Sequence, residues 1–207
     1  MDDHSTRALL LQSGKRLFSL KGYDGTTVKD LADEAGVNIS LVSYYFGGKE
    51  GLYRACLQDF SDSRLQLAKR ILTDPESVDD LKVRLSLFFQ EMIQLYVDEP
   101  DLTRLVHCAN DSSQSITDTV VPMLFKIFDM QHTFLKLAQN KGFIDPAVDV
   151  QITTRLCFGM LAHVIKTDHL QEKQFAVSIR DSNYRERVLV QLRLLLFEGI
   201  LQKKTHP

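Results

Sequence analysis

Glycine is distributed very unevenly along this chain of 207 residues, and that distribution limits what the chain can fold into. Seven of the ten glycines fall within the first 51 residues, and none occurs between Leu52 and Lys141. Because glycine suits turns and helix ends better than helix interiors, the pattern predicts short elements at the N-terminus and long helices after them. No hairpin dipeptide is flanked by alternating apolar residues, so strands are not expected. We predict an all-α fold.

The spacing of apolar residues predicts about nine helices. Most prolines stand between the periodic stretches, where a helix can begin or end. The change from short to long helices divides the chain into a small N-terminal domain, residues 1–50, and a larger helical domain, residues 51–207. Residues 171–183 are expected to be a loop or a helix extension. The predicted helices span residues 5–21, 28–35, 39–46, 49–72, 78–97, 102–110, 122–140, 146–169 and 184–203.

The composition is that of a globular protein, with 44% apolar and 25% charged residues. A net charge of −2 provides no bulk attraction to nucleic acid, so DNA binding would have to come from local geometry. The N-terminus lacks the apolar run of a signal peptide, and residues 188–201 fall short of the ~20 residues that span a bilayer. Cys56, Cys108 and Cys157 lie far apart in the sequence. They are expected to be buried thiols of a reduced, cytoplasmic protein.

The helices at residues 28–35 and 39–46 are joined by a three-residue turn. This is the spacing of a helix-turn-helix, in which the second helix enters the major groove of DNA. Thr27 is the expected N-cap of the first helix, with Asp30 completing a capping box. The spacing alone leaves open an ordinary pair of packed helices with no role in DNA binding.

A helical projection divides the second of these helices into two arcs. Val42 and Phe46, with Ile39 at the edge, are expected to face the protein. The opposite arc is expected to be exposed, and it consists of Ser40, Leu41, Ser43 and Tyr44. It carries hydroxyl groups, one leucine and one aromatic ring, but no Arg, Lys or Gln that could bind guanine with two hydrogen bonds.

Eight short motifs occur in register over the first fifty or so residues. Together they resemble the N-terminal region of the tetracycline-repressor (TetR) family of bacterial transcriptional regulators. Beyond about residue 55 the resemblance is confined to helix number and a long, apolar final helix pair. The motifs are Leu10-Leu11, Leu17-Phe18, Gly22-Tyr23, Thr26-Thr27-Val28, Asp30-Leu31-Ala32, Ala35-Gly36-Val37, Tyr44-Tyr45-Phe46 and Lys49-Glu50-Gly51-Leu52.

The resemblance implies that residues 1–50 form a helix-turn-helix DNA-binding domain and that two subunits bind a palindrome of double-stranded DNA. Residues 1–50 carry six Lys or Arg and seven Asp or Glu, so this region has no excess of positive charge. Backbone N–H groups at helix N-termini would therefore have to provide many of the contacts to DNA phosphates. Ile39 and the pair Val42-Ser43 depart from the usual family residues. Carried over to this sequence, the contacts to phosphate would come from Thr27, Lys29, Tyr45 and Lys49, and the residues facing the bases would be Asn38, Ser40, Leu41, Ser43 and Tyr44.

The last two predicted helices are apolar around most of their circumference, so each needs a covering on two sides. One side can face the core of the protein itself, and the resemblance implies that the other packs on a second copy. A central helix of one large monomer is the alternative. The expected residues of the homodimer interface are Phe158, Leu161, Leu192, Leu195 and Leu196.

The resemblance also implies a pocket for a small, mostly apolar effector in residues 51–207. Polar residues among apolar ones could anchor such a ligand, and these are Tyr96, His107, Asn110, Gln131, His132 and His163. The alternative is that each is satisfied locally. No cofactor is expected, and no metal, because His107 and Cys108 face different directions and His163 and His169 are six residues apart. The candidate effector residues are Met92, Tyr96, His107, Asn110, Phe128, His132, Met160 and His163.

Enzymatic function is not expected. The sequence contains no phosphate-binding glycine loop, nucleophile elbow, HExxH or CxxC motif. We therefore expect a one-component transcriptional regulator, a repressor that a small molecule releases from its operator. The alternative is a DNA-bound structural or division-linked protein that uses the same fold without a ligand.

Overall fold

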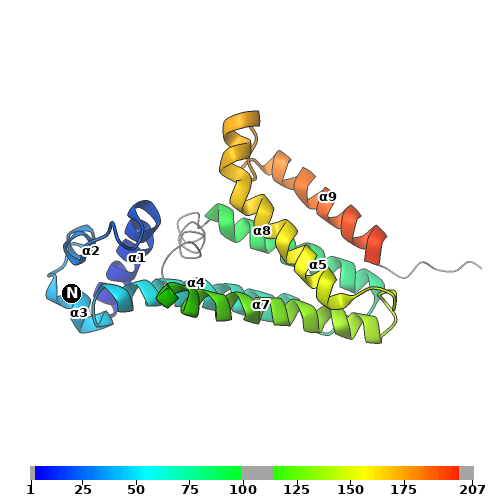
Figure 1. Ribbon diagram of the computed structural model, residues 1–207, viewed down its shortest axis with the longest axis horizontal. Helices are drawn as coiled ribbons and strands as arrows, with labels where there is room; N and C mark the ends of the chain where they lie inside the picture. Colours follow the sequence, from blue (N-terminus) through cyan, green and yellow to red (C-terminus); the bar gives the residue numbers. More distant parts are fainter. Residues whose placement is uncertain (1–2, 99–113, 201–207) are drawn as a thin grey trace, which may run out of the picture. The chain divides into compact units, whose positions relative to one another are not determined.

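The computed structural model describes residues 3–98 and 114–200. Within these ranges the chain forms eight helices and no strand, which confirms the predicted all-α fold (Figure 1). The helix predicted at residues 102–110 lies outside the described residues. The helices are α1 (Asp3–Lys21), α2 (Val28–Ala35), α3 (Ser40–Phe46), α4 (Lys49–Ile71), α5 (Val78–Asp98), α7 (Gln114–Asn140), α8 (Val150–Phe175) and α9 (Ser182–Ile200).

Two of the long helices differ from the sequence prediction at their ends. Helix α7 begins at Gln114 and contains Pro122 in its interior, so this proline does not mark the helix start. Helix α8 begins only at Val150, because the side chain of Asp149 accepts a hydrogen bond from the backbone N–H of Ile152 at 3.0 Å and caps the helix there. It then continues to Phe175, so the first part of residues 171–183 is a helix extension.

The chain divides into two compact units. The N-terminal unit runs to Ser63 inside α4 and includes the first part of α7, up to Leu124. The C-terminal unit comprises residues 64–98 and everything from Phe125 onward. Each unit has a hydrophobic core of its own. The functional division expected near residue 50 stays a prediction.

The core of the N-terminal unit joins α1, α2, α3 and the first half of α4. Leu10, Phe18, Leu31, Val42 and Leu52 are fully buried in it. Gly14 of α1 lies where α1 and α4 approach closely: a Cβ atom added there would come within 2.9 Å of the Cys56 sulfur and 3.2 Å of Leu52 Cγ. This contact fixes the spacing of the helices that support α2 and α3.

Gly14→Leu is expected to destabilise the protein by about 1–3 kcal/mol, because the added side chain overpacks a contact that already excludes a methyl group. Urea denaturation followed by circular dichroism measures the change. Gln12→Leu, at an exposed position of the same helix, is the matched control and should leave the midpoint nearly unchanged. Equal midpoints for the two variants would contradict the close approach of α1 and α4.

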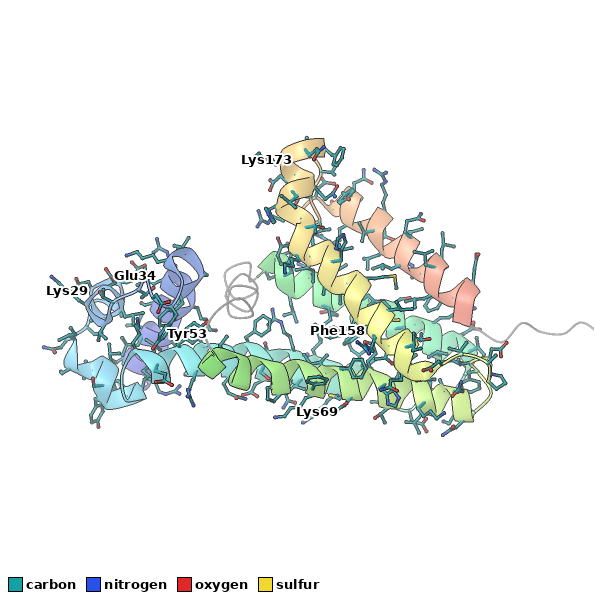
Figure 2. The ribbon with its side chains drawn as sticks, in the orientation of Figure 1. Lys29, Glu34, Tyr53, Lys69, Phe158 and Lys173 are labelled. Carbon is teal, nitrogen blue, oxygen red and sulfur yellow. The ribbon has the colours of Figure 1, made fainter. Side chains whose placement is uncertain are left out.

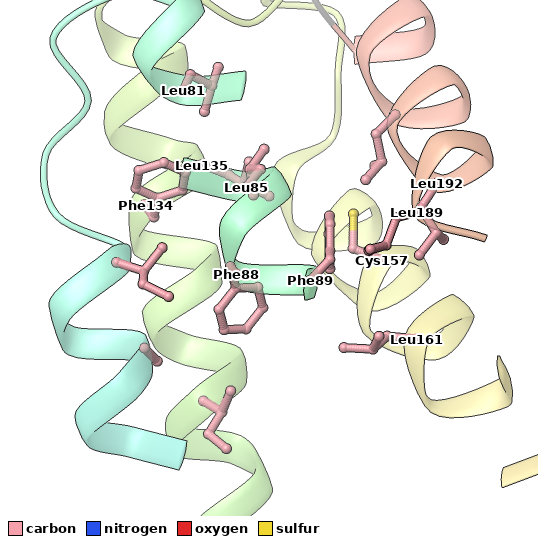
Figure 3. Packing of buried hydrophobic residues seen from close by; sticks show 14 of the residues in the cluster. Leu81, Leu85, Phe88, Phe89, Phe134, Leu135, Cys157, Leu161, Leu189 and Leu192 are labelled. Atoms are coloured by element: carbon pink, nitrogen blue, oxygen red, sulfur yellow. The ribbon is translucent and has the colours of Figure 1, made fainter. Parts of the chain in front are cut away.

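The core of the C-terminal unit is built around α5, which packs against both α8 and α9. Phe88 and Phe89 of α5 meet Phe134 and Leu135 of α7 on one side and the leucines of α8 and α9 on the other (Figure 3). Leu161, Leu192 and Leu196 are buried in this core. Three of the five leucine and phenylalanine residues expected at a subunit interface therefore hold a single protomer together.

Candidate nucleic-acid interface and effector domain

The start and the end of α2 are fixed by local hydrogen bonds, as the sequence predicts. The Thr27 hydroxyl accepts from the backbone N–H of Asp30 at 3.0 Å, and Asp30 accepts from the backbone N–H of Thr27 at 2.9 Å. These bonds from Thr27, with Lys21 nearby, lower the pKa of the Asp30 carboxyl. Gly36 then ends α2 in the left-handed conformation at φ 66°. The backbone N–H groups of Thr27 and Asp30 are both engaged within the capping box, and the Asp30 carboxylate adds a negative charge there. The start of α2 is therefore a poorer phosphate site than the sequence suggests.

Helix α3 is held by a side chain before it and by its buried face. Asn38 Oδ1 accepts hydrogen bonds from the backbone N–H and the hydroxyl of Ser40, at 2.9 and 2.8 Å. Val42 in the middle of the helix is completely buried, and Gly47 ends the helix at φ 72°. The two-turn helix is thus fixed on the N-terminal unit before any ligand arrives, with Asn38 and Ser40 already bonded to each other.

The exposed surface of α3 agrees with the helical projection at three positions and differs at two. Ser40, Ser43 and Tyr44 are exposed, Tyr44 at 75%. Ile39, expected at the edge of the buried arc, is 49% exposed, because it precedes the first turn of the helix. Leu41, expected to be exposed, is half-buried against the core of the N-terminal unit. The apolar surface available to DNA therefore includes more of Ile39 and less of Leu41 than predicted.

The expected phosphate ligands are not equally available. Lys29 on α2 is exposed (Figure 2), whereas Tyr45 is half-buried against the core. Lys49 already donates to the backbone carbonyl of Tyr23 at 2.9 Å and lies 4.1 Å from the centre of the Tyr23 ring. Lys49 thus ties the start of α4 to the turn between α1 and α2.

One cation beside α3 was missed by the sequence analysis. The guanidinium of Arg7 on α1 lies 5.1 Å from the centre of the Phe46 ring, and Arg7 is an exposed residue. This places a positive charge next to the C-terminal end of α3. Thirty-nine residues separate the pair in sequence, so no motif or periodicity links them.

The candidate effector residues within the described part of the chain have different surroundings. Met92 is half-buried against the core, and Phe128 stacks on His132 with ring centres 6.4 Å apart. Met160 and His163 line a groove between α8 and α9. His107 and Asn110 lie outside the described residues. The remaining candidate, Tyr96, has a local partner.

That partner is Asp168 on α8, a buried carboxylate that the sequence analysis did not single out. Asp168 is 2% exposed and accepts hydrogen bonds from the Ser178 hydroxyl and the Ile179 backbone N–H, both at 2.8 Å. The Tyr96 hydroxyl donates to it at 3.4 Å, and burial together with this carboxylate raises the pKa of Tyr96. Asp168 therefore joins α5, α8 and the segment that leads into α9.

The groove between α8 and α9 has a volume of about 650 Å³ and is lined mainly by apolar side chains. On its α9 side Leu195 is 66% exposed, while Ile152 and Leu156 are exposed along α8. Gly159 is also exposed, and a Cβ added there would meet no atom of the other described helices within 4 Å. Of the five expected interface residues only Leu195 is exposed, and Phe158 is half-buried.

Cys56 and Cys157 are buried, and their burial raises the pKa of each thiol to about 12. At pH 8 only about one thiol in ten thousand would be ionised, and the thiolate is the reactive form. Iodoacetamide at pH 8 should leave both residues unmodified in the folded protein and alkylate both in urea, as peptide mass mapping would show. Rapid alkylation of either residue without urea would contradict their burial.

Across residues 3–98 and 114–200, no three His, Cys, Asp or Glu side chains are placed to hold a metal ion. Likewise, none of the helices in these ranges is long and apolar enough to cross a membrane.

Residues 10–56 match the family described as "Bacterial regulatory proteins, tetR family". The chain is 25% identical over 131 residues to the "Probable HTH-type transcriptional regulator YttP" of Bacillus subtilis, which covers 63% of this chain and 61% of the relative. It is 28% identical over 160 residues to the "HTH-type transcriptional repressor AcnR" of Corynebacterium glutamicum, covering 68% and 80%. The crystal structure of FadR from Bacillus subtilis in complex with stearoyl-CoA shares the fold, with a TM-score of 0.75 at 16% identity over 89% of this chain and 96% of FadR.

Helices α2 and α3 have the geometry of a helix-turn-helix, and the relatives that this chain matches are transcriptional regulators. The resemblance to the TetR family is confirmed, and residues 10–56 are the part of the chain that matches the family model. Its relatives are transcriptional regulators, a class of protein that typically has no catalytic activity.

Proposed function

We propose that the protein is a one-component repressor that binds a palindromic operator as a homodimer and leaves it when a small, mostly apolar effector binds. The observation that carries the proposal is α3 itself. Its Val42 side chain is buried, its first residue Ser40 is hydrogen-bonded to the Asn38 side chain, and Ser40, Ser43 and Tyr44 are exposed. A preorganised helix with this exposure suits the major groove.

The exposed residues of α3 favour a particular kind of base recognition. No Arg, Lys or Gln occurs on the helix, so strong bidentate contacts to guanine would not come from it. Ile39, and the exposed part of Leu41, can pack on thymine methyl groups, while the two serine hydroxyls accept or donate to several bases. We propose half-sites with A·T pairs under the N-terminal end of α3.

Apolar side chains exposed on α8 and α9 support dimerisation through the C-terminal unit. Leu195 lines the apolar groove between α8 and α9, Ile152 and Leu156 are exposed on α8, and a second copy would cover these side chains. A symmetric dimer would present two α3 helices to the two halves of a palindrome.

The apolar core of the C-terminal unit supports an apolar effector, as does the shared fold of FadR, whose structure holds stearoyl-CoA. Such a ligand can release DNA only if it binds the released conformation more tightly than the DNA-bound one. A tenfold loss of operator affinity requires a difference of about 1.4 kcal/mol.

Selection of binding sites from random DNA tests the proposal, and a palindrome with A·T pairs at the positions facing α3 is expected. Lys29→Ala should weaken binding about equally on all DNA sequences. Because it removes one phosphate contact, it should also reduce the slope of log binding constant against log salt concentration by about one. Lys69→Ala, an exposed lysine of the C-terminal unit (Figure 2), is the control and should change neither.

Recovery of no preferred sequence would refute the operator proposal. Occupancy of many dispersed chromosomal sites, unaffected by small molecules, would favour the ligand-independent DNA-bound protein instead.

A further inference from the structure

One face of α7 is a continuous buried stripe, and a single polar residue interrupts it. Residues 127, 131, 134, 135 and 138 recur at helical spacing, and all are at most 1% exposed. Four of them are apolar, and Phe134 and Leu135 pack directly on α5 (Figure 3). The fifth is Gln131, one turn before that pair and 0% exposed. Its amide therefore lies inside the apolar core of the C-terminal unit.

Within residues 3–98 and 114–200, neither the nitrogen nor the oxygen of the Gln131 amide has a hydrogen-bond partner. The other buried polar groups of this unit do: the Thr154 hydroxyl donates to the Val150 carbonyl at 2.7 Å, and Asp168 binds Ser178 and Ile179. A buried amide without partners is costly, and native proteins rarely keep one without a reason. An apolar residue at this position would make the core more stable. We therefore look for a hydrogen-bond partner of the amide in a bound molecule.

We propose that Gln131 is the polar anchor of the effector, and that the effector is an apolar molecule carrying a neutral carboxamide or lactam group. This inference rests on the proposed function. A primary amide offers a donor and an acceptor side by side, and another amide matches both with two parallel hydrogen bonds. Gln131 has no charge to neutralise a carboxylate or a phosphate, so an ionised ligand group would be buried without compensation.

Two probes of equal chain length test the chemistry. Decanamide presents both a donor and an acceptor, whereas methyl decanoate presents only acceptors. Isothermal titration calorimetry on the wild-type protein should show decanamide binding at least tenfold more tightly, equivalent to about 1.4 kcal/mol. Gln131→Met keeps the volume but removes the amide. It should abolish this preference while leaving methyl decanoate affinity within twofold and the thermal midpoint of the free protein unchanged or raised.

Gln151→Met, at an exposed position on α8, is the matched control and should keep the preference for decanamide. Equal affinity of the wild type for the two probes, or no binding of either, would overturn the proposal. So would a lower thermal midpoint of Gln131→Met, since it would mean that the amide has a structural partner. The wild-type comparison does not depend on the variant folding.

DNA binding separates this inference from the proposed function. Gln131→Met should bind the selected operator like the wild type in the absence of a probe. A wild-type protein that prefers decanamide but selects no DNA sequence would contradict the proposed repressor function and support Gln131 as the effector anchor. Specific DNA binding without a preference between the probes would support the repressor function and contradict the role of Gln131.

Discussion

Leu195→Glu is expected to convert a dimer into a folded monomer and to weaken binding to a palindromic operator by at least about 100-fold. Leu195 is largely exposed on the protomer, so the substitution leaves the core intact. In the proposed dimer it would bury a charge without a partner, which is strongly unfavourable. A monomer can engage only one half-site at a time and loses the advantage of linked binding. Sedimentation velocity and fluorescence anisotropy with labelled DNA measure the two effects.

Val83→Glu is the matched control for this experiment, since Val83 is an exposed apolar residue on another helix, α5. It should leave both the mass and the operator affinity unchanged. Glutamate at Leu192 or Leu196 would not test dimerisation, because both side chains are buried in the protomer and the substitution would unfold the C-terminal unit. A wild-type protein that sediments as a monomer at micromolar concentration would contradict the proposed dimer, and so would a Leu195→Glu variant that remains dimeric.

Asp168→Ala is expected to lower the free energy of unfolding by about 3–5 kcal/mol. The substitution leaves the Ser178 hydroxyl and the Ile179 N–H buried without their acceptor, and it removes the partner of Tyr96. Asp168→Asn should be less damaging, because its amide oxygen can still accept from Ile179. Urea denaturation followed by circular dichroism gives both values. Asp129→Ala, at an exposed site on α7, should stay within about 0.5 kcal/mol of the wild type. Similar values for Asp168→Ala and Asp129→Ala would show that the buried network contributes little.

In the region from Thr27 to Gly47, most of the local structure could be predicted from the sequence alone. The Thr27–Asp30 capping box, the left-handed Gly36 and the bounds of α2 all agree with the sequence prediction. The Asn38 side chain, just before α3, accepts a hydrogen bond from the backbone N–H of Ser40. The exposure of single side chains near the start of α3 was predicted less well, since Ile39 is exposed and Leu41 is partly covered.

Two contacts join residues that are far apart in the sequence. Tyr96 and its partner Asp168 are 72 positions apart, and Arg7 and Phe46 are thirty-nine positions apart. Both contacts depend on how separate helices pack. The same holds for the orientation of α8 and α9: apolar residues surround most of each helix, so periodicity could not show that Leu192 faces the core and Leu195 the solvent.

The sequence by itself determined the local structure of this protein: the all-α fold, the helix-turn-helix and its caps, and the TetR character of residues 10–56. The reason is that capping bonds and tight turns join residues two to four positions apart, which a motif can encode. Only the tertiary structure decided which side of α9 is covered, that Tyr96 is bound to Asp168, and that Gln131 is buried with no partner in the described part of the chain. Burial and long-range hydrogen bonding depend on which neighbouring helix covers each face, and that information is not contained in the periodicity of any one helix.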